Sequence, residues 1–420
     1  MTHAKRTLAA MLIPFALTGA AQAQLSLPGR LPALGDVLGS DVLGEVRSRV
    51  DVASDLPSRA ARALADARSV RISALVRAHP DRIAIDPDGF AARAGEVVVD
   101  DADDALIAKA AAKGYAVIER GDILGVGFVR LATPPGQSLK TAIRGLRTLG
   151  AKQVSADQLH AQGGVAVSAD GRAAGDDRAV GSDGPSPVIG MIDGGVDRSG
   201  SMQRGFATGA PRASDHGSAV ASLIVGRGMV RGAAPTARLH VADVYGSDPA
   251  GGNAVAIAKA LGWLVTEHVP VVTISLVGPP NPLLARVVAA AQARGTIVVA
   301  AVGNDGPAAP SSYPASYPGV IAVTGVDARG RVLIEAGRAT HLDYAAPGAD
   351  MLAADATGRA TAVRGTSFAA PLVAATIARA YPTVDESARK RAIRAVDAAA
   401  KPGSRYGRGL VCGDCRTPAK

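Results

Sequence analysis

Three short motifs contain an aspartate, a histidine and a serine, in that order along the chain. Asp193 lies in Ile-Asp-Gly-Gly-Val, His216 in Asp-His-Gly-Ser-Ala, and Ser367 in Gly-Thr-Ser-Phe-Ala-Ala-Pro. A serine hydroxyl becomes a good nucleophile when a neutral histidine, with a pKa of about 6.5, takes its proton. A carboxylate beside that histidine holds the useful tautomer and stabilises the imidazolium. The three motifs together therefore predict a catalytic Asp-His-Ser set.

Each of these motifs also has an ordinary structural interpretation. Asp-Gly-Gly is a common turn, a histidine before glycine often begins a helix, and Gly-Thr-Ser occurs widely. The prediction depends on their joint occurrence, each after a predicted strand or at a predicted helix start. His240, His268 and His341 lie outside the motifs and are predicted to be structural or surface residues.

In this order, the motifs resemble those of the subtilisin-like serine peptidases, over roughly residues 188–397. The resemblance implies hydrolysis of peptide bonds through an acyl-enzyme, with Ser367 as nucleophile, His216 as base and acid, and Asp193 as the orienting carboxylate. Asn304, in Ala-Val-Gly-Asn-Asp-Gly, matches the family's oxyanion asparagine, which would act together with the Ser367 amide. The 23 residues from Asp193 to His216 are few for this family, so we expect a trimmed loop there.

Two further segments resemble the walls of the family's first specificity pocket, and one of them pairs with an extended peptide substrate. The pairing wall is Ser275, Leu276, Val277 and Gly278, and the other wall is Ala300, Ala301, Val302 and Gly303. Val277 stands where the family often has a second glycine, which predicts a narrowed pocket. Thr273 and Gly194 replace the family's usual Asn and its usual Ser or Thr, but neither change removes a catalytic atom.

After residue 187, short apolar runs alternate with helical patterns. The predicted strands are 188–192, 238–244, 269–276, 296–302 and 320–326, and the predicted helices include 216–225, 253–267 and 283–293. Strands without polar alternation are covered on both faces, and their alternation with helices predicts an α/β fold. We therefore expect a mostly parallel sheet with helices on both faces, in a subtilisin-like peptidase domain over residues 188–400. Its ligands should bind at the carboxyl ends of the strands.

A small α+β domain is predicted before this peptidase domain, over residues 70–160. Its predicted strands are 95–99, 115–119 and 126–131, and its predicted helices are 104–113 and 139–149. Its position and element order resemble the inhibitory, fold-assisting propeptides of the family. Residues 24–69 are predicted to be a flexible or loosely helical leader without an assigned function.

The segment 161–187 is rich in Gly, Ala, Ser and Asp and is predicted to be an exposed linker. Exposed linkers are where chains are cut. We expect Ser367 to cleave its own precursor in this segment.

The N-terminal 23 residues have the plan of a secretory signal peptide: a charged start, an apolar stretch and Ala-Gln-Ala at 21–23. Cleavage is expected after Ala23, and the protein is expected to be secreted or periplasmic. In the tail at 401–420, Cys412 and Cys415 fit an exported chain as a disulfide. A zinc half-site or a redox motif is the alternative, although no histidine follows His341 to complete a zinc site.

The composition excludes several classes of protein. With 420 residues, 48% hydrophobic and 20% charged, the chain has room for two or three folded domains and is not disordered as a whole. Apart from the N-terminal stretch, which is itself too short, no apolar run approaches a membrane span. Only 3% of residues are aromatic, so no nucleic-acid partner is expected despite the net charge of +9.

After residue 187 there are 24 Lys and Arg against 16 Asp and Glu. This excess favours an arginine-rich solvated surface over selection for acidic substrates.

The expected function is that of an exported serine endopeptidase with polypeptide substrates and its own propeptide as intramolecular inhibitor. No cofactor is required by this chemistry; calcium is often bound in the family, but no acidic loop allows its ligands to be assigned. One alternative is a catalytically inert, peptidase-like binding protein. A lipase or esterase is disfavoured because the serine motif lacks the second glycine of Gly-x-Ser-x-Gly and because the serine comes last.

Overall fold

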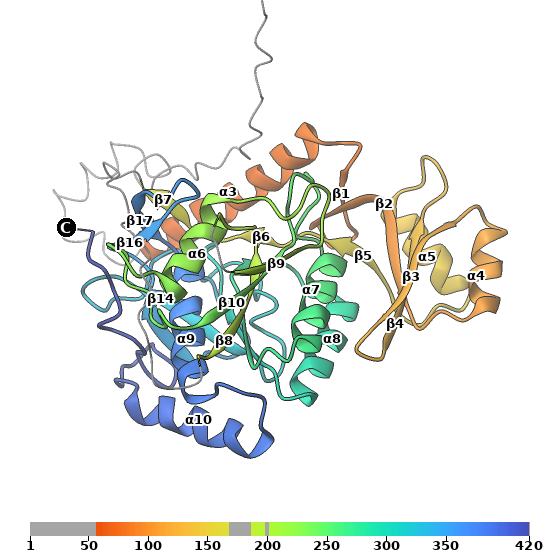
Figure 1. Cartoon of the computed structure of the whole chain (residues 1–420). Coiled ribbons are helices and arrows are strands. Elements are labelled where there is room, and N and C mark those ends of the chain that lie inside the picture. Colours follow the sequence, from red (N-terminus) through yellow and green to blue (C-terminus); the bar gives the residue numbers. More distant parts are fainter. Residues whose placement is uncertain (1–55, 168–185, 198–200, 420) are drawn as a thin grey trace, which may run out of the picture.

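The apolar strands after residue 187 pair into one seven-stranded sheet, which forms the centre of the larger part of the molecule (Figure 1). The strand order is β15-β14-β13-β11-β8-β10-β9, and every pairing is parallel. The strands are β8 (Val188–Asp193), β9 (Met202–Gly205), β10 (Arg238–Asp243), β11 (Val271–Ile274), β13 (Ile297–Ala301), β14 (Ile321–Val326) and β15 (Tyr344–Pro347). The computed structural model describes residues 56–167, 186–197 and 201–419. The predicted signal peptide lies outside the described residues.

Helices cover both faces of this sheet. They are α6 (Asp215–Val225) and α9 (Ala370–Ala380) on one face, and α7 (Ala254–Thr266) and α8 (Pro282–Ala293) on the other. Successive side chains of a strand point to opposite faces. Val271 therefore packs in the core that contains α6 and α9, and Val272 in the core that contains α7 and α8. The predicted α/β fold, a mostly parallel sheet with helices on both faces, is confirmed.

The helices around the site begin at side-chain caps that the sequence supplies. Ser214, Asn253 and Asn281 each accept a hydrogen bond from the backbone N–H three residues further on, at the starts of α6, α7 and α8. Helix α6 also packs closely on the loop after β8. A β-carbon built on Gly217 would lie 2.4 Å from the carbonyl oxygen of Gly194, so glycine is needed for this approach.

A second, antiparallel sheet forms the N-terminal domain, at the right of Figure 1. Its elements are β1 (Ile83–Ile85), β2 (Ala91–Asp100), α4 (Asp104–Ala111), β3 (Ala116–Ile123), β4 (Val126–Ala132), α5 (Leu139–Thr148) and β5 (Val154–Gln158). Strand β2 pairs with β1, β4 and β5, and β4 pairs with β3. Helices α4 and α5 cover one face. The other face, through Val98 and Phe128, shares a core with α7 and α8.

The N-terminal domain begins earlier than expected. Helix α3 (Leu56–Ala78) crosses the expected boundary at residue 70, so the last part of the expected leader is helical. Residues 24–55 lie outside the described residues. Helix α3 contacts the peptidase domain: Arg68 pairs with Asp305, and a β-carbon on Gly306 would lie 2.8 Å from Leu64. Its apolar periodicity is weak because part of its contact surface is ionic.

Residues 161–167 are not an exposed linker as expected, because they form strands on the peptidase domain. Strand β6 (Ala161–Gln162) pairs with β12 (Leu276–Val277), and β7 (Val165–Val167) pairs with β17 (Ala360–Arg364), both antiparallel. These pairings use backbone groups, so the absence of apolar periodicity did not reveal them. The rest of the expected linker, residues 168–185, lies outside the described residues.

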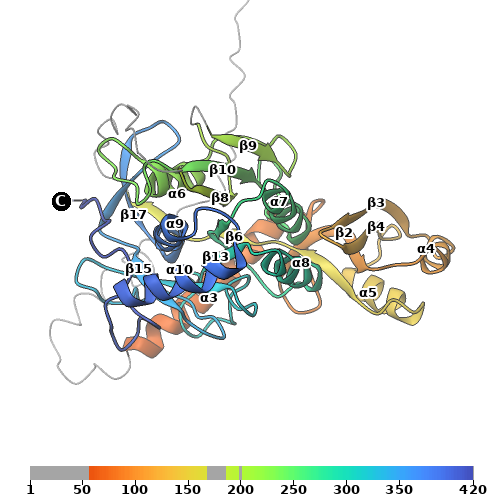
Figure 2. The same cartoon turned by 60° about the horizontal axis from the view of Figure 1, so that its bottom comes forward.

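The C-terminal tail is part of the peptidase domain. After α10 (Glu386–Ala399), Leu410 forms a β-bridge with Ala345 at the sheet edge, and Val411 is buried in the core with α6 and α9 (Figure 2). Cys412 and Cys415 are joined by a disulfide and pack against the same core.

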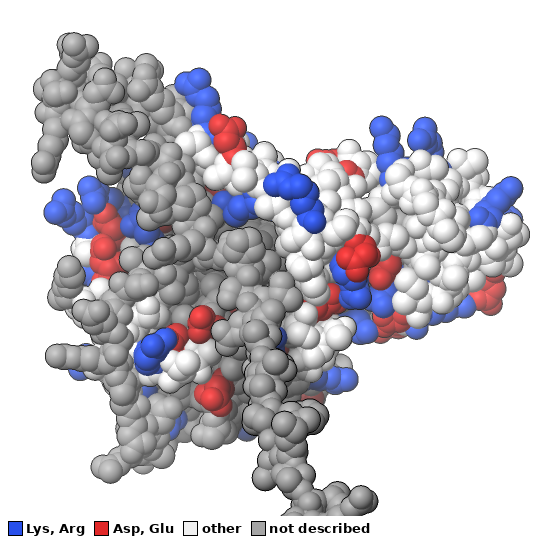
Figure 3. Space-filling view, turned by 90° about the horizontal axis from the view of Figure 1, so that it is seen from above, with Lys and Arg blue, Asp and Glu red and all other residues white. Residues whose placement is uncertain are grey.

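The surface carries charges of both signs. On the uncovered part of the face in Figure 3, Lys and Arg side chains stand beside Asp and Glu side chains over the N-terminal domain and around it. Over the described ranges, 56–167, 186–197 and 201–419, no helix has the length and apolar character needed to cross a membrane.

Candidate active site

The loops at the carboxyl ends of the parallel strands bring Asp193 and His216 together. Asp193 ends β8 and is fully buried, and His216 lies in the first turn of α6. The two carboxylate oxygens of Asp193 lie 2.9 and 3.0 Å from Nδ1 of His216. The Gly194 amide and the Gln162 side chain also donate to Oδ1 of Asp193, at 2.7 and 2.9 Å. These donors hold the carboxylate in its orientation towards the imidazole.

The other ring nitrogen of His216 contacts the N-terminal part of the chain. Nε2 lies 2.9 Å from the carbonyl oxygen of Gly163. Both partners of the ring are acceptors only, so both nitrogens carry protons in this arrangement. Burial alone lowers the pKa of His216, but the charge and hydrogen bond of Asp193, together with the Gly163 carbonyl, raise it above the ordinary value of histidine. The histidine is therefore held in its charged form.

Ser367 lies in the 3₁₀ turn Thr366–Phe368, just before α9, and is fully buried. Its hydroxyl donates to the carbonyl of Ser275 at 3.1 Å, and the Ser275 hydroxyl donates back to the Ser367 carbonyl at 2.8 Å. The His216 ring packs against Phe368, with 5.4 Å between ring centroids. Gly163 lies beside both Ser367 and His216. Its carbonyl oxygen contacts His216, and a β-carbon built on it would lie 2.8 Å from the Ser367 hydroxyl.

Asn304 follows β13 and is oriented by the serine turn. Its Oδ1 accepts from the Thr366 amide at 2.9 Å, which leaves Nδ2 free to act as a donor. Within the described part of the chain, this buried Nδ2 has no hydrogen-bond partner. A β-carbon on Gly163 would lie 2.8 Å from it. An unpaired buried donor costs about 1–3 kcal/mol, so Nδ2 is available to donate to a group that enters the site.

The predicted peptide-pairing wall does pair with a peptide, namely the chain's own segment 161–162. Gln162 lies opposite Leu276 and Ala161 opposite Val277 in the antiparallel ladder. On the far side of Gly163, the chain continues through Gly164 into β7. The chain therefore lies across the candidate site in an extended conformation, like a substrate.

The two predicted walls of the first specificity pocket lie close together at Val277. A β-carbon on Gly303 would lie 3.0 Å from Cγ1 of Val277, so the two walls approach each other closely. Of the other predicted wall residues, Ala300 packs in the core with α7 and α8, and Ala301 packs in the core with α6 and α9. These two alanines support the wall from within the sheet.

Several residues that form the site lie outside the recognised sequence motifs. They are Gln162 on the Asp193 carboxylate, Thr366 on the Gly303 backbone, and the pair Gly163–Gly164 in the cleft. Only the glycine pair has a signal in the sequence, and glycine pairs are common in loops. The structure also explains the departure at Gly194, because a β-carbon there would lie 2.2 Å from the Ser214 hydroxyl.

The remaining histidines lie in other surroundings. His240 stacks on Trp263, and His341 hydrogen-bonds the Val320 carbonyl at 2.7 Å. No group of three or more His, Cys, Asp or Glu side chains in the described ranges is arranged to hold a metal ion.

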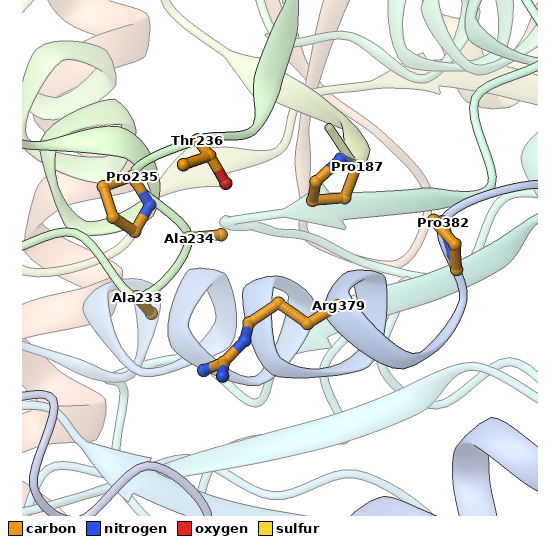
Figure 4. Close-up of a pocket in the computed structure, with 7 residues that line it drawn as sticks. All are labelled: Pro187, Ala233, Ala234, Pro235, Thr236, Arg379 and Pro382. Atoms are coloured by element: carbon orange, nitrogen blue, oxygen red, sulfur yellow. The ribbon is translucent and has the colours of Figure 1, made fainter. Parts of the chain in front are cut away.

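Figure 4 shows a hollow of about 570 Å³ whose lining includes none of the site residues described above. It is lined by Pro187, Ala233, Ala234, Pro235, Thr236, Arg379 and Pro382. Pro187 precedes β8 and Thr236 precedes β10, which places this hollow at the amino ends of the strands. Ligands of parallel sheets bind at the opposite ends, where Asp193 lies.

Comparison with known proteins gives a consistent result. The family model described as the subtilase family matches residues 188–407. Subtilisin DY of Bacillus licheniformis is 30% identical over 252 residues, which cover 56% of this chain and 92% of the relative. Subtilisin E of Bacillus subtilis (strain 168) is 29% identical over 281 residues, which cover 62% of this chain and 69% of the relative.

Two solved structures share the fold at low identity. Fervidolysin from Fervidobacterium pennivorans, a keratinolytic enzyme related to subtilisin, superposes with a TM-score of 0.62 at 19% identity, covering 76% of this chain and 60% of that one. The epidermin leader peptide processing serine protease of Staphylococcus aureus gives 0.58 at 18%, covering 77% and 97%. These two likenesses concern the fold alone.

Proposed function

Because the chain belongs to the subtilase family and is a serine endopeptidase that acts on polypeptides, we propose that Asp193, His216 and Ser367 form its catalytic triad. Ser367 attacks the substrate carbonyl, and His216 takes the hydroxyl proton and later gives it to the leaving amine. Asp193 holds the ring through Nδ1 and stabilises the imidazolium. The observation that carries this proposal is the pair of contacts at 2.9 and 3.0 Å between the Asp193 carboxylate and His216 Nδ1.

Asn304 is the proposed side-chain donor to the oxyanion, and the Ser367 amide is the second donor. The fixed orientation of the asparagine supports this role, because Thr366 holds Oδ1 and Nδ2 remains available. A donor that is oriented before the reaction needs no reorganisation in the transition state. The proposed reaction uses no cofactor.

The N-terminal domain is proposed to be a propeptide that inhibits the enzyme until it is cut away. Its sheet shares a core with α7 and α8, and the segment after β5 fills the substrate cleft. The proposal includes self-processing by Ser367. It also includes export after removal of the signal peptide at Ala23, which depends on the sequence pattern.

Expression of the whole chain tests the proposal, with Ser367→Ala and a serine control, Ser69→Ala, on the exposed face of α3. The wild type and the Ser69→Ala variant should each yield a mature fragment that binds a fluorophosphonate at Ser367. The Ser367→Ala protein should remain whole and unlabelled. A mature fragment from Ser367→Ala in a protease-free host would refute self-processing. A folded wild type that is neither cut nor labelled would favour an inert binding protein.

A further inference from the structure

We infer that the chain cuts itself between Gly163 and Gly164, and that its cleft requires glycine on both sides of that bond. This inference rests on the proposed function. It names the bond within the self-processing segment and the residue type that the site accepts.

The strand before the bond is held in the register of a substrate. Ala161 lies opposite Val277 and Gln162 opposite Leu276, so the next residue, Gly163, reaches the end of the pairing wall beside Ser275. Ser275 is the residue whose carbonyl accepts the hydrogen bond of the Ser367 hydroxyl. The ladder therefore places Gly163 beside the proposed nucleophile, Ser367.

The strand after the bond is held as well. Val165 lies opposite Arg364, Ala166 opposite Val363 and Val167 opposite Ala362 in the antiparallel pairing of β7 with β17. Arg364 is only three residues before Ser367. The chain is thus clamped by backbone pairing on both sides of a two-residue gap, Gly163–Gly164, which spans the serine turn.

The space around Gly163 has no room for a side chain. A β-carbon built on it would lie 2.8 Å from both the Asn304 Nδ2 and the Ser367 hydroxyl, and 3.5 Å from Cγ2 of Val277. The first two atoms belong to the proposed catalytic groups, and Asn304 is held by Thr366. A larger residue at position 163 would therefore displace the groups that must act on it.

Gly164 is restricted for a second reason. Its φ of +110° lies in the region that favours glycine, and a β-carbon would lie 2.6 Å from Cε2 of Phe368 and 3.0 Å from the Arg364 carbonyl oxygen. Phe368 is buried against the His216 ring, so it has little freedom to move. At both residues of the bond, the neighbouring atoms lie too close to leave room for a β-carbon, so only glycine fits.

The bond lies in a resting orientation, with the Gly163 carbonyl on His216 Nε2. Cleavage requires this oxygen to turn towards Asn304 Nδ2. The turn changes the backbone dihedral angles of Gly163 and Gly164, and glycine permits such changes. Once the contact with Nε2 is broken, His216 releases its Nε2 proton to solvent, and Ser367 Oγ bonds to the carbonyl carbon while the hydroxyl proton passes to the deprotonated Nε2. The bond to the Gly164 nitrogen breaks, and that nitrogen takes the proton. Water hydrolyses the ester, which leaves a Gly163 carboxylate and restores the serine.

The first experiment uses the whole chain and four variants: Ser367→Ala, Gly163→Val, Gly164→Val and the control Ser69→Ala, at an exposed side chain of α3 outside the site. Mass spectrometry of the wild-type and Ser69→Ala mature fragments should give Gly164 as the first residue. Processing of both valine variants should fall by more than about 100-fold, because a displacement of about 1 Å in a reacting group costs that much. A different first residue, or processing of Gly163→Val at the wild-type rate, would overturn the inference.

A second experiment avoids any folding defect of the variants. The processed wild-type protein receives a nine-residue peptide with the sequence of residues 159–167, and a copy with valine in place of Gly163. The glycine peptide should be cut between its two glycines, and the valine peptide at least about 100 times more slowly. Equal cleavage would overturn the inference while leaving the proposed function intact. A wild type that neither binds fluorophosphonate nor cuts any peptide would instead contradict the proposed function.

Discussion

The carbonyl oxygen of Gly163 lies 2.9 Å from Nε2 of His216, the ring nitrogen that receives the serine proton in the proposed mechanism. While this contact lasts, Nε2 carries a proton of its own, so His216 cannot act as a base. The proposed propeptide therefore blocks the enzyme in two ways. It fills the cleft, and it holds the histidine in its charged form.

Replacement of Asn304 should slow catalysis without loosening substrate binding. Asn304→Ala removes the proposed oxyanion donor, so kcat for a peptide substrate should fall by about 10² to 10³ with KM nearly unchanged; this range was measured in subtilisin, a member of the same family. Because Oδ1 of Asn304 also holds the Thr366 amide, Asn304→Asp is the matched control. It keeps that acceptor, loses the donor and adds a charge that repels an oxyanion, so its kcat should fall at least as far. Wild-type kcat in Asn304→Asp would show that Nδ2 does not contact the transition state.

Opening the narrow pocket should change specificity. Val277→Gly removes the γ-carbons that lie against Gly303, so residues larger than glycine should gain access. Each methylene-sized change in such a pocket is worth roughly 10- to 200-fold in kcat/KM. Peptides that differ only in the residue before the scissile bond give the measurement, with alanine and leucine compared to glycine. An unchanged order of preference in a folded, active Val277→Gly protein would place the selectivity elsewhere.

Acid should weaken the hold of the N-terminal domain through His160. This side chain is buried between the two domains, where a β-carbon on Gly278 would lie 2.5 Å from its ring, and the Tyr245 hydroxyl donates to its backbone carbonyl at 2.6 Å. Burial lowers the pKa of His160 to about 4, and a backbone contact with Gln158 offsets only part of that effect. Below about pH 6.5 the released domain binds a proton that the docked domain does not, so docking weakens as the pH falls from about 6.5 towards 4.

The measurement must separate His160 from Asp157, which titrates in the opposite sense. Burial raises the pKa of Asp157 to about 7, so its protonation in acid favours the docked state. We therefore expect the ratio of the two fragments' dissociation constants, wild type over His160→Phe, to rise by about 100-fold between pH 7 and pH 4. A constant ratio would show that His160 is not protonated on release.

Salt should loosen the contact of α3 with the peptidase domain. Arg68 and Arg71 both pair with Asp305, next to the proposed oxyanion residue. These groups are partly exposed, so each pair contributes about 1 kcal/mol or less and is screened by salt. Asp305→Ala removes both pairs, so the dissociation constant of the processed fragments should rise by roughly 5- to 30-fold at low ionic strength. In about 0.5 M salt the increase should be smaller.

The control for this prediction is Asp327→Ala, which removes a carboxylate whose ion pair, with Arg331, lies within one turn of the peptidase domain. Its dissociation constant should match the wild type at every salt concentration. If Asp305→Ala also matches, the ion pairs of α3 contribute nothing to docking.

The sequence was sufficient for the apolar strands β8, β10, β11, β13 and β14, but β9 and β15 of the same sheet, and β1 and β5 of the N-terminal domain, were not predicted. The predicted strand 296–302 is observed as β13 (Ile297–Ala301), and the predicted helix 139–149 as α5 (Leu139–Thr148). Their side-chain patterns repeat with the period of the element, and burial in one core produces that pattern. The extent of α3 was missed because a helix that docks partly through Arg68 and Arg71 needs no continuous apolar stripe.

The residues that could do chemistry were recognisable for a related reason. Acyl transfer needs a hydroxyl, an imidazole and a carboxylate, and few other side chains can replace them. Residue types alone therefore pointed to Asp193, His216 and Ser367, before any distance between them was known. Distances came only from the fold, since Ser367 lies 151 residues after His216 in the chain.

The occupant of the cleft was decided by the tertiary structure alone. Backbone hydrogen bonds hold Ala161–Gln162 on β12 and Val165–Val167 on β17, and every residue except proline offers the same backbone groups. Such pairing does not depend on side chains, so it produces no side-chain pattern in the sequence. Two adjacent glycines in a polar stretch predict only a loop, and they acquire a specific meaning once Asn304, Ser367 and Phe368 stand around them.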